Sequence, residues 1–188
     1  WGDRILPALY LFAPEHMLGA KTFPAWAEAR AAFDALRKAT VAAGLPTPYL
    51  VIQHWSVKDS NDQMEKLGFD AVSAYASNGG GKQAPYAQLA RHTEQWWEQF
   101  RATGAKVVPL VSAGWDRRPR VENPVPWEGP GGDIQQYYNP PTPEELAAHL
   151  KAALDWTVRH PDAAEAKAVL IYAWNEFDDG GWLCPTLT

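Results

Sequence analysis

The chain alternates between short apolar runs and longer segments in which apolar residues recur every three or four positions. Five runs consist almost entirely of Val, Ile, Leu, Ala and Tyr: Ile5–Phe12, Tyr49–His54, Ala71–Tyr75, Lys106–Ser112 and Ala168–Trp174. Apolar runs that do not alternate with charged residues are typical of strands covered on both faces, as in a parallel sheet. The sequence therefore predicts five buried β-strands.

The segments between these runs carry helical patterns. Helices are predicted over Ala25–Ala43, Asn61–Leu67 and Tyr86–Thr103, each followed by a glycine, and from Thr142 onward. The start at Thr142 has the clearest signal, because Thr142 can cap the helix and Pro143 suits the first helical position. Glu145 then completes a capping box with Thr142.

Strands and helices alternate along the chain, which predicts parallel strands joined by right-handed crossovers. A doubly wound sheet and a (β/α)8 barrel both fit this order. The run Gly79-Gly80-Gly81-Lys82 lacks the glycine spacing and the following Ser or Thr of a nucleotide loop, which favours the barrel. A whole barrel takes about 250 residues. We therefore interpret residues 1–188 as one α/β domain, strands four to eight of a TIM-type barrel, with the N-terminal half of the barrel elsewhere in the full-length protein.

Composition excludes several classes of binding partner and site for this domain. The net charge is −5 and no large Lys/Arg cluster is present, which argues against a nucleic-acid groove or an anionic membrane surface. The single cysteine, Cys184, excludes an internal disulfide framework and a Cys-rich zinc site. No apolar run approaches the ~18 residues of a membrane span. The start, Trp1-Gly2-Asp3-Arg4, lacks the features of a signal peptide.

Polar and aromatic residues gather where the predicted strands end. In (β/α)8 barrels the active site lies at the carboxyl ends of the strands. The residues expected to bind substrate there are Trp174, Asn175, Trp182, Trp115, Asp116, Arg118, Tyr75, His54 and Trp55. A hydrogen-bonded core position is the alternative for His54.

The last strand ends in the strongest chemical signal. Glu176 and Asp179 are three residues apart in an acidic turn, close enough to serve one bond. Glycosidic cleavage needs two carboxyl groups, of which one gives a proton to the leaving oxygen and the other acts as base or nucleophile. Trp174 and Trp182 flank the pair and can stack on sugar faces. The alternative interpretation is a solvated acidic turn with its Trp residues in the core.

A long connection from Ala113 to Pro141 follows the fourth strand. Unstructured connections longer than about 12–15 residues are usually functional or disordered, and this one is too aromatic for a disordered linker. It is expected to form a lid that turns Trp115, Asp116 and Arg118 toward the substrate; a purely structural, salt-bridged lid is the alternative. Glu15 and His16 have no third ligand at a convincing spacing. The sequence therefore predicts neither a metal nor a cofactor.

Three motifs resemble the glycoside hydrolase family 99-like barrels, which include endo-α-mannosidases and transferases of lipopolysaccharide loci. They are Ala173-Trp174-Asn175-Glu176-Phe177-Asp178-Asp179-Gly180-Gly181-Trp182-Leu183-Cys184-Pro185-Thr186, Gly114-Trp115-Asp116-Arg117-Arg118-Pro119-Arg120 and Gly68-Phe69-Asp70-Ala71-Val72-Ser73-Ala74-Tyr75. The resemblance implies that Glu176 is a base toward the sugar 2-hydroxyl and that Asp179 protonates the leaving group. The mannosidases have Glu at the position of Asp179.

The sequence-based hypothesis is a glycoside hydrolase that acts on a polysaccharide or glycan. A non-catalytic glycan-binding barrel and a glycosyltransferase of envelope polysaccharide synthesis are the alternatives. The transferase ranks last because a sugar-nucleotide enzyme should show a diphosphate site, and no basic loop or Asp-bound metal is clear. The expected partner is a carbohydrate and not a nucleic acid. A polysaccharide hydrolase would favour a secreted or periplasmic location.

Overall fold

The computed structural model describes residues 6–19, 21–76, 79–127 and 131–185. It is a mixed α/β structure with parallel strands, which confirms the predicted fold class at that level. The chain divides into two compact units. Unit 1 comprises residues 1–75, 99–108 and 161–167, and unit 2 comprises residues 76–98, 109–160 and 168–188. The single-domain and barrel interpretations stay predictions.

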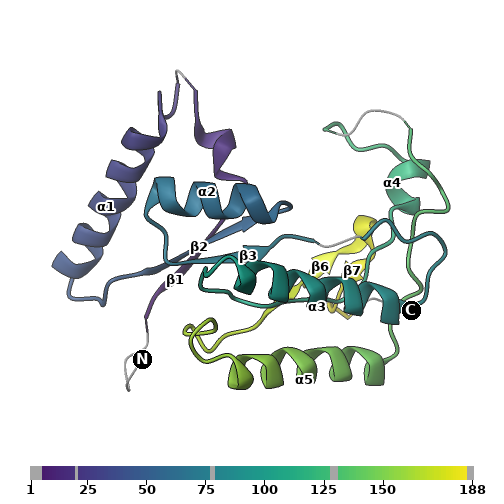
Figure 1. Cartoon of the computed structure of the whole chain (residues 1–188). Helices are drawn as coiled ribbons and strands as arrows, with labels where there is room; N and C mark the ends of the chain where they lie inside the picture. The colour runs from purple at the N-terminus through teal and green to yellow at the C-terminus, as the bar shows by residue number, and fades with distance from the viewer. Residues whose placement is uncertain (1–5, 20, 77–78, 128–130, 186–188) are drawn as a thin grey trace. The chain divides into compact units, whose positions relative to one another are not determined.

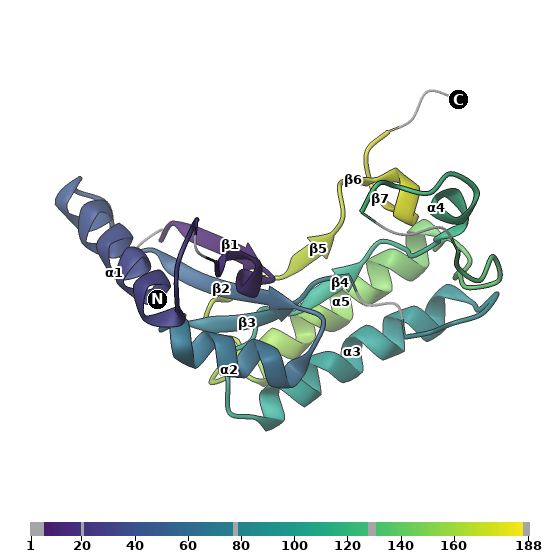
Figure 2. The same ribbon diagram turned by 90° about the horizontal axis from the view of Figure 1, so that it is seen from above.

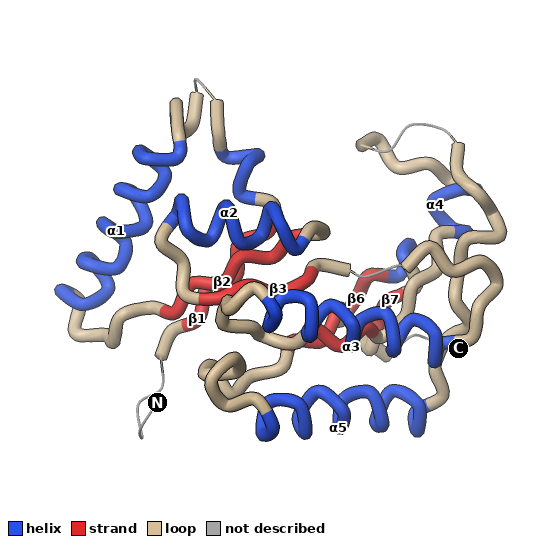
Figure 3. Tube along the Cα trace, viewed as in Figure 1, coloured by secondary structure: helices blue, strands red, loops and turns tan. Residues whose placement is uncertain are grey.

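Unit 1 is built on a parallel sheet of three strands in the order β1 (Ala8–Phe12), β2 (Tyr49–His54) and β3 (Ala71–Ala74) (Figure 3). The middle strand is covered on both faces, since Leu50, Val51 and Ile52 are all fully buried. The unbroken apolar run that predicted this strand is therefore explained by burial from both sides.

Two helices connect the strands of unit 1 (Figure 1): α1 (Trp26–Ala42) and α2 (Val57–Leu67). A short 3₁₀ helix, η1 (Pro14–Met17), follows β1. Helix α2 begins four residues before the predicted Asn61 because the Ser56 side chain caps it, accepting the Asp59 amide at 3.2 Å.

Unit 2 contains a parallel pair of strands, β4 (Leu110–Ser112) and β5 (Leu170–Tyr172), and two long helices, α3 (Tyr86–Ala102) and α5 (Pro143–Arg159). The part of α3 that belongs to this unit runs beside α5 (Figure 2), and the Trp156 indole donates to Glu98 at 2.7 Å. The predicted capping box at Thr142 and Glu145 is present, with both hydrogen bonds formed.

Four elements of unit 2 were not predicted. The connection after β4 contains a short helix, α4 (Arg118–Glu122), and β5 leads into a hairpin of β6 (Asn175–Glu176), the 3₁₀ helix η2 (Phe177–Asp179) and β7 (Gly181–Trp182). The predicted strand Ala168–Trp174 is shorter than expected, because the Trp174 carbonyl accepts the amides of Leu183 and Cys184 instead of continuing beside β4. Ile5, Asn78 and Thr186 lie outside the described residues.

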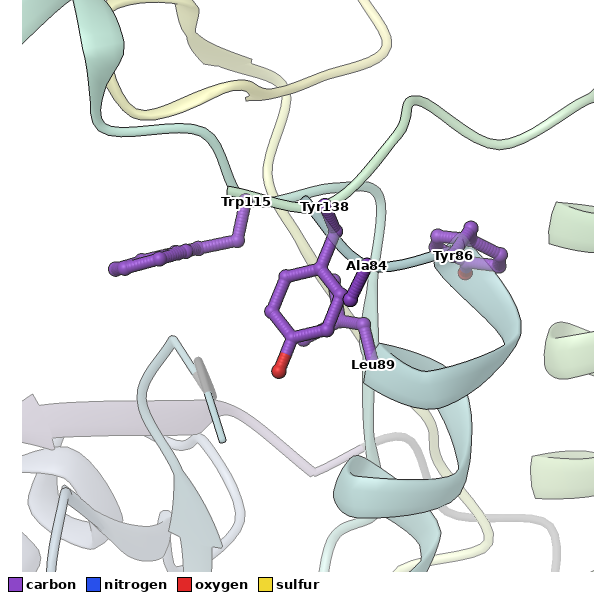
Figure 4. Packing of buried hydrophobic residues seen from close by; sticks show 5 residues of the cluster. All are labelled: Ala84, Tyr86, Leu89, Trp115 and Tyr138. Atoms are coloured by element: carbon purple, nitrogen blue, oxygen red, sulfur yellow. The ribbon is translucent and has the colours of Figure 1, made fainter. Parts of the chain in front are cut away.

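The long connection after β4 is anchored by a hydrophobic cluster. Its buried members, shown in Figure 4, are Ala84, Tyr86, Leu89, Trp115 and Tyr138. Trp115 and Tyr138 are also joined through their backbones, since the Tyr138 amide donates to the Trp115 carbonyl at 3.0 Å. Both ends of the connection are therefore packed against the start of α3. Among the described helices, none has the length and apolar character that a membrane crossing requires.

Candidate active site

Three carboxylates of unit 2 surround one arginine. Arg120, on α4, places Nη2 at 3.2 Å from Glu176 Oε1, Nε at 3.1 Å from Asp178 Oδ2 and Nη1 at 3.6 Å from Asp179 Oδ1. The Arg120 side chain is only 12% exposed. One guanidinium therefore holds both members of the predicted acid pair, Glu176 and Asp179, in a common cluster.

Close backbone packing brings the two loops of this cluster together. The Asp116 amide donates to the Asp179 carbonyl at 2.9 Å, which joins the start of the long connection to η2. Gly180 has φ +70°, and a Cβ there would lie 2.5 Å from Asp116 Cβ. A Cβ on Gly114 would lie 2.3 Å from the Gly180 carbonyl oxygen. The glycines after the acid pair and before Trp115 thus permit the contact that positions Asp179.

Asp179 is the most deeply buried acid of the cluster, with 5% of the residue exposed. Its Oδ2 lies 3.4 Å from the Tyr172 hydroxyl, and within the described residues its Oδ1 has no hydrogen-bond partner. Burial raises the pKa of Asp179 to about 6; the charge of Glu176 raises it as well, while Arg120 opposes the shift. A carboxyl with this pKa exchanges its proton near neutral pH.

The hairpin that carries the acids also exposes aromatic rings. Trp174 is 63% exposed, and Phe177 and Trp182 are nearly half exposed. The Phe177 and Trp182 rings lie 5.8 Å apart. Asn175 is exposed and pairs with Trp182 across the hairpin. Flat apolar surface therefore borders the carboxylates. The alternative interpretation, in which these Trp residues lie in the core, is wrong.

The three predicted lid residues differ in burial: Asp116 and Arg118 are partly exposed, and Trp115 is buried. Asp116 and Arg118 pair with each other, with Arg118 Nη2 at 2.6 Å from Asp116 Oδ2, and the Arg118 guanidinium lies 3.8 Å from the Tyr137 ring centroid. Burial works to raise the pKa of Asp116, but the hydrogen bonds from Arg118 outweigh it and the pKa is lowered. Trp115 is buried in the hydrophobic cluster.

Arg120 is the site residue that the sequence reasoning missed. In the sequence it stands only as the last residue of the Gly114–Arg120 motif, and in the structure it is Arg118 that pairs with Asp116. The available signal was Pro119, which favours a helix start and makes Arg120 the next residue of a helical turn. A short helix predicted there would have placed the Arg118 and Arg120 side chains on different sides of the helix.

The remaining predicted binding residues, His54, Trp55 and Tyr75, belong to unit 1. His54 is buried and hydrogen-bonded to Glu15, as its core alternative describes, and Trp55 is half exposed. Whether they share a site with Glu176 stays a prediction. Among the residues that the structure describes, no three His, Cys, Asp or Glu side chains are placed to hold a metal ion.

Comparison with known proteins gives distant structural similarity and no match in sequence. No family model matches the chain, and no curated protein matches it. A GH99 endo-alpha-mannosidase from Bacteroides thetaiotaomicron, solved in complex with BIS-TRIS-propane, is similar in structure at 16% sequence identity and a TM-score of 0.43. The match covers 72% of this chain and 35% of the mannosidase, so the chain spans about a third of that protein.

Proposed function

We propose that this chain carries the carboxylate pair of a glycoside hydrolase. The observation that carries the proposal is the Arg120 cluster, in which a buried carboxyl with a raised pKa shares a guanidinium with a second carboxylate. Two acids in unlike environments are the usual means by which one site supplies both a proton donor and a proton acceptor. The resemblance of the Trp174–Trp182 motif to family 99-like barrels supports the same chemistry.

In the proposed reaction Asp179 is the acid. It gives its proton to the glycosidic oxygen as the bond from that oxygen to the anomeric carbon breaks, and the leaving sugar departs as an alcohol. Glu176 is the base or nucleophile on the other side of the bond. If it removes the proton of the sugar 2-hydroxyl, that oxygen closes on the anomeric carbon and water later opens the ring. Arg120 supplies positive charge beside both acids.

Substrate binding is proposed for the exposed groups of the hairpin. Trp174 and Trp182 offer ring faces for the C–H surface of a sugar, and the Asn175 amide can bond hydroxyl groups. Asp116 and Arg118, both partly exposed, border the cluster through the Asp116–Asp179 backbone contact. Trp115 acts by packing, since its indole lies inside the hydrophobic cluster. The frame proposed for this site is the C-terminal part of a (β/α)8 barrel.

A non-catalytic glycan-binding role is the second candidate. The observation that favours it is that Arg120 already engages Glu176, Asp178 and Asp179, as a structural ion-pair network would. Such a network needs no proton transfer. The two functions therefore differ in whether removal of the Glu176 charge stops turnover.

Turnover by the full chain would be measured on polysaccharides, as release of reducing ends, and on aryl glycosides, as release of the phenol. Glu176→Gln should lower kcat/KM at least about 10³-fold on both substrates, because it removes a group needed in the transition state. Asp179→Asn should lose far more activity on polysaccharide than on aryl glycosides, whose leaving groups need no proton. Asp155→Asn, an exposed acid on α5, is the control and should match the parent. Full activity in Glu176→Gln would contradict the hydrolase proposal and favour the glycan-binding function.

A further inference from the structure

Unit 1 holds a second immobilised carboxylate, Glu15, where β1 ends. Its Oε1 lies 3.1 Å from His54 Nε2, and its Oε2 accepts the Gln63 amide at 2.9 Å. The turn that positions Glu15 is strained, because Ala13 is buried and has φ 44°, in the left-handed region. Non-glycine residues in this region persist where the surrounding structure enforces them, often at binding sites.

The hydrogen bonds of His54 define its protonation. Its Nδ1 accepts the Ser56 amide at 3.0 Å, so Nδ1 carries no proton. The proton of the neutral ring is therefore on Nε2, which donates to Glu15. His54 is 8% exposed and acts as a fixed hydrogen-bond donor to the carboxylate.

Glu15 remains an ionised acceptor in this setting. Burial works to raise its pKa, but a backbone amide, His54 and Gln63 all donate to the carboxylate, and the pKa is lowered. The side chain is 34% exposed, so the carboxylate also faces solvent. Each oxygen has one side-chain donor within the protein, and the exposed part of the carboxylate can accept a further hydrogen bond from a ligand.

Trp55 follows His54 at the end of β2, and its ring centroid lies 6.1 Å from that of His54, the donor to Glu15. Its ring has a fixed plane and an open surface. The Phe12 ring lies 4.6 Å from it at 87°, and the Tyr75 ring lies 6.0 Å from it at 85°. Phe12 and Tyr75 are themselves stacked at 3.9 Å. Half of Trp55 is nevertheless exposed. Supporting rings hold the indole in place without covering it.

We propose that Glu15 and Trp55 form a binding site for a pyranose sugar at the carboxyl ends of β1 and β2. The C–H face of the sugar stacks on the exposed indole, and its hydroxyl groups donate to the fixed carboxylate. A ligand with both an apolar face and several hydroxyl donors matches this pair. A quaternary ammonium is the less suitable ligand, because aromatic cages present several ring faces to a cation and here the neighbouring rings meet Trp55 at near right angles.

This inference rests on the proposed carbohydrate function but requires no turnover. A failure of sugar binding at Trp55 can therefore be distinguished from a failure of the hydrolase proposal. The full chain would be labelled with 5-fluorotryptophan and titrated with the methyl pyranosides of glucose, galactose and mannose. The ¹⁹F signal of Trp55 would be assigned as the one missing from Trp55→Phe. At least one pyranoside should shift it, and Glu176→Gln should show the same shift with the same affinity.

Variants separate recognition from packing. Glu15→Gln should weaken the sugar affinity read from Trp55 about tenfold, because a charge-assisted hydrogen bond becomes a neutral one. Glu28→Gln, an exposed acid on α1, is the matched control and should leave the affinity unchanged. Sugar-dependent protection of unit 1 amides from exchange gives a second readout, which Trp55→Ala should abolish. The proposal is overturned if no pyranoside shifts Trp55, if Glu15→Gln binds like the parent, or if tetramethylammonium shifts Trp55 and the sugars do not.

Discussion

Glu15 in unit 1 and Asp179 in unit 2 are both partly or fully buried carboxyls near strand ends, yet their pKa values move in opposite directions. The pKa of Glu15 is lowered, and that of Asp179 is raised to about 6. Burial acts to raise the pKa of both. Asp179 is the more deeply buried of the two, with 5% of the residue exposed, whereas the Glu15 side chain is 34% exposed. Their neighbours differ as well: Glu15 receives hydrogen bonds on both oxygens, whereas Asp179 faces Glu176 and leaves one buried oxygen without a hydrogen bond in the described structure.

Depth of burial and hydrogen-bond donors together therefore decide what each carboxyl can do. A carboxylate with its donors in place keeps its charge and can only accept hydrogen bonds. A buried carboxyl that lacks them holds its proton to higher pH and can donate it. Unit 1 has the features of a fixed acceptor, and unit 2 has those of a proton donor.

The largest expected effect comes from removal of Arg120, the only cation that contacts all three acids of the cluster in the described structure. Arg120→Gln should lower the free energy of unfolding at pH 7 by about 4 kcal/mol, because it leaves the buried Asp179 carboxylate and the partly buried Glu176 carboxylate uncompensated. Lys151→Gln, which breaks an exposed ion pair on α5, should lower it by less than about 0.5 kcal/mol. Urea unfolding measures both. Equal losses would show that the Arg120 cluster is a surface network.

The pH dependence of stability should separate the two carboxyls. Between about pH 4 and pH 6 the folded state holds the Asp179 proton and the unfolded state does not, so stability from this group falls as pH rises, by about 3 kcal/mol in all. Asp179→Asn should remove that fall. Glu15 has the opposite sign: its contribution is present above its unfolded pKa and is lost as pH falls through the lower folded pKa. Urea midpoints of parent and Asp179→Asn that run parallel from pH 4 to pH 7 would contradict the assignment.

The smallest expected effect tests the backbone contact behind Asp179. Gly180→Ala should destabilise the chain by about 2 kcal/mol more than Gly44→Ala, since both glycines have positive φ but only Gly180 has a neighbour that a Cβ would strike. Thermal unfolding of the two variants gives the comparison. If the losses are equal, Asp116 moves freely away from Gly180 and the contact does not position Asp179.

Sequence patterns predicted the elements whose cause is local or strongly periodic. The run Tyr49–His54 matches β2 residue for residue, and the Thr142 capping box formed as expected. The hairpin after β5 could not be predicted in the same way, because it depends on the Trp174 carbonyl bonding Leu183 and Cys184. The start of α2 was missed although Ser56 is a common capping residue.

The candidate site was partly predictable for the same reason. Glu176 and Asp179 are close in sequence, so their shared turn could be foreseen, while Arg120 reaches them from 56 residues away. The Glu15–His54 bond spans 39 residues and depends on parallel pairing of β1 with β2. Contacts between segments distant in sequence need the register of the sheet, which single-sequence patterns do not contain.

The proposal that Asp179 is a proton donor near neutral pH is tested by a carbon NMR titration of the full chain labelled at its aspartate carboxyl groups. Asp179→Asn identifies the signal by its loss. We expect this signal to titrate near pH 6, well above the ordinary aspartate pKa of about 3.9. An Asp179 signal that titrates at or below the ordinary value would mean a permanently ionised partner of Arg120 and would contradict the proposed acid.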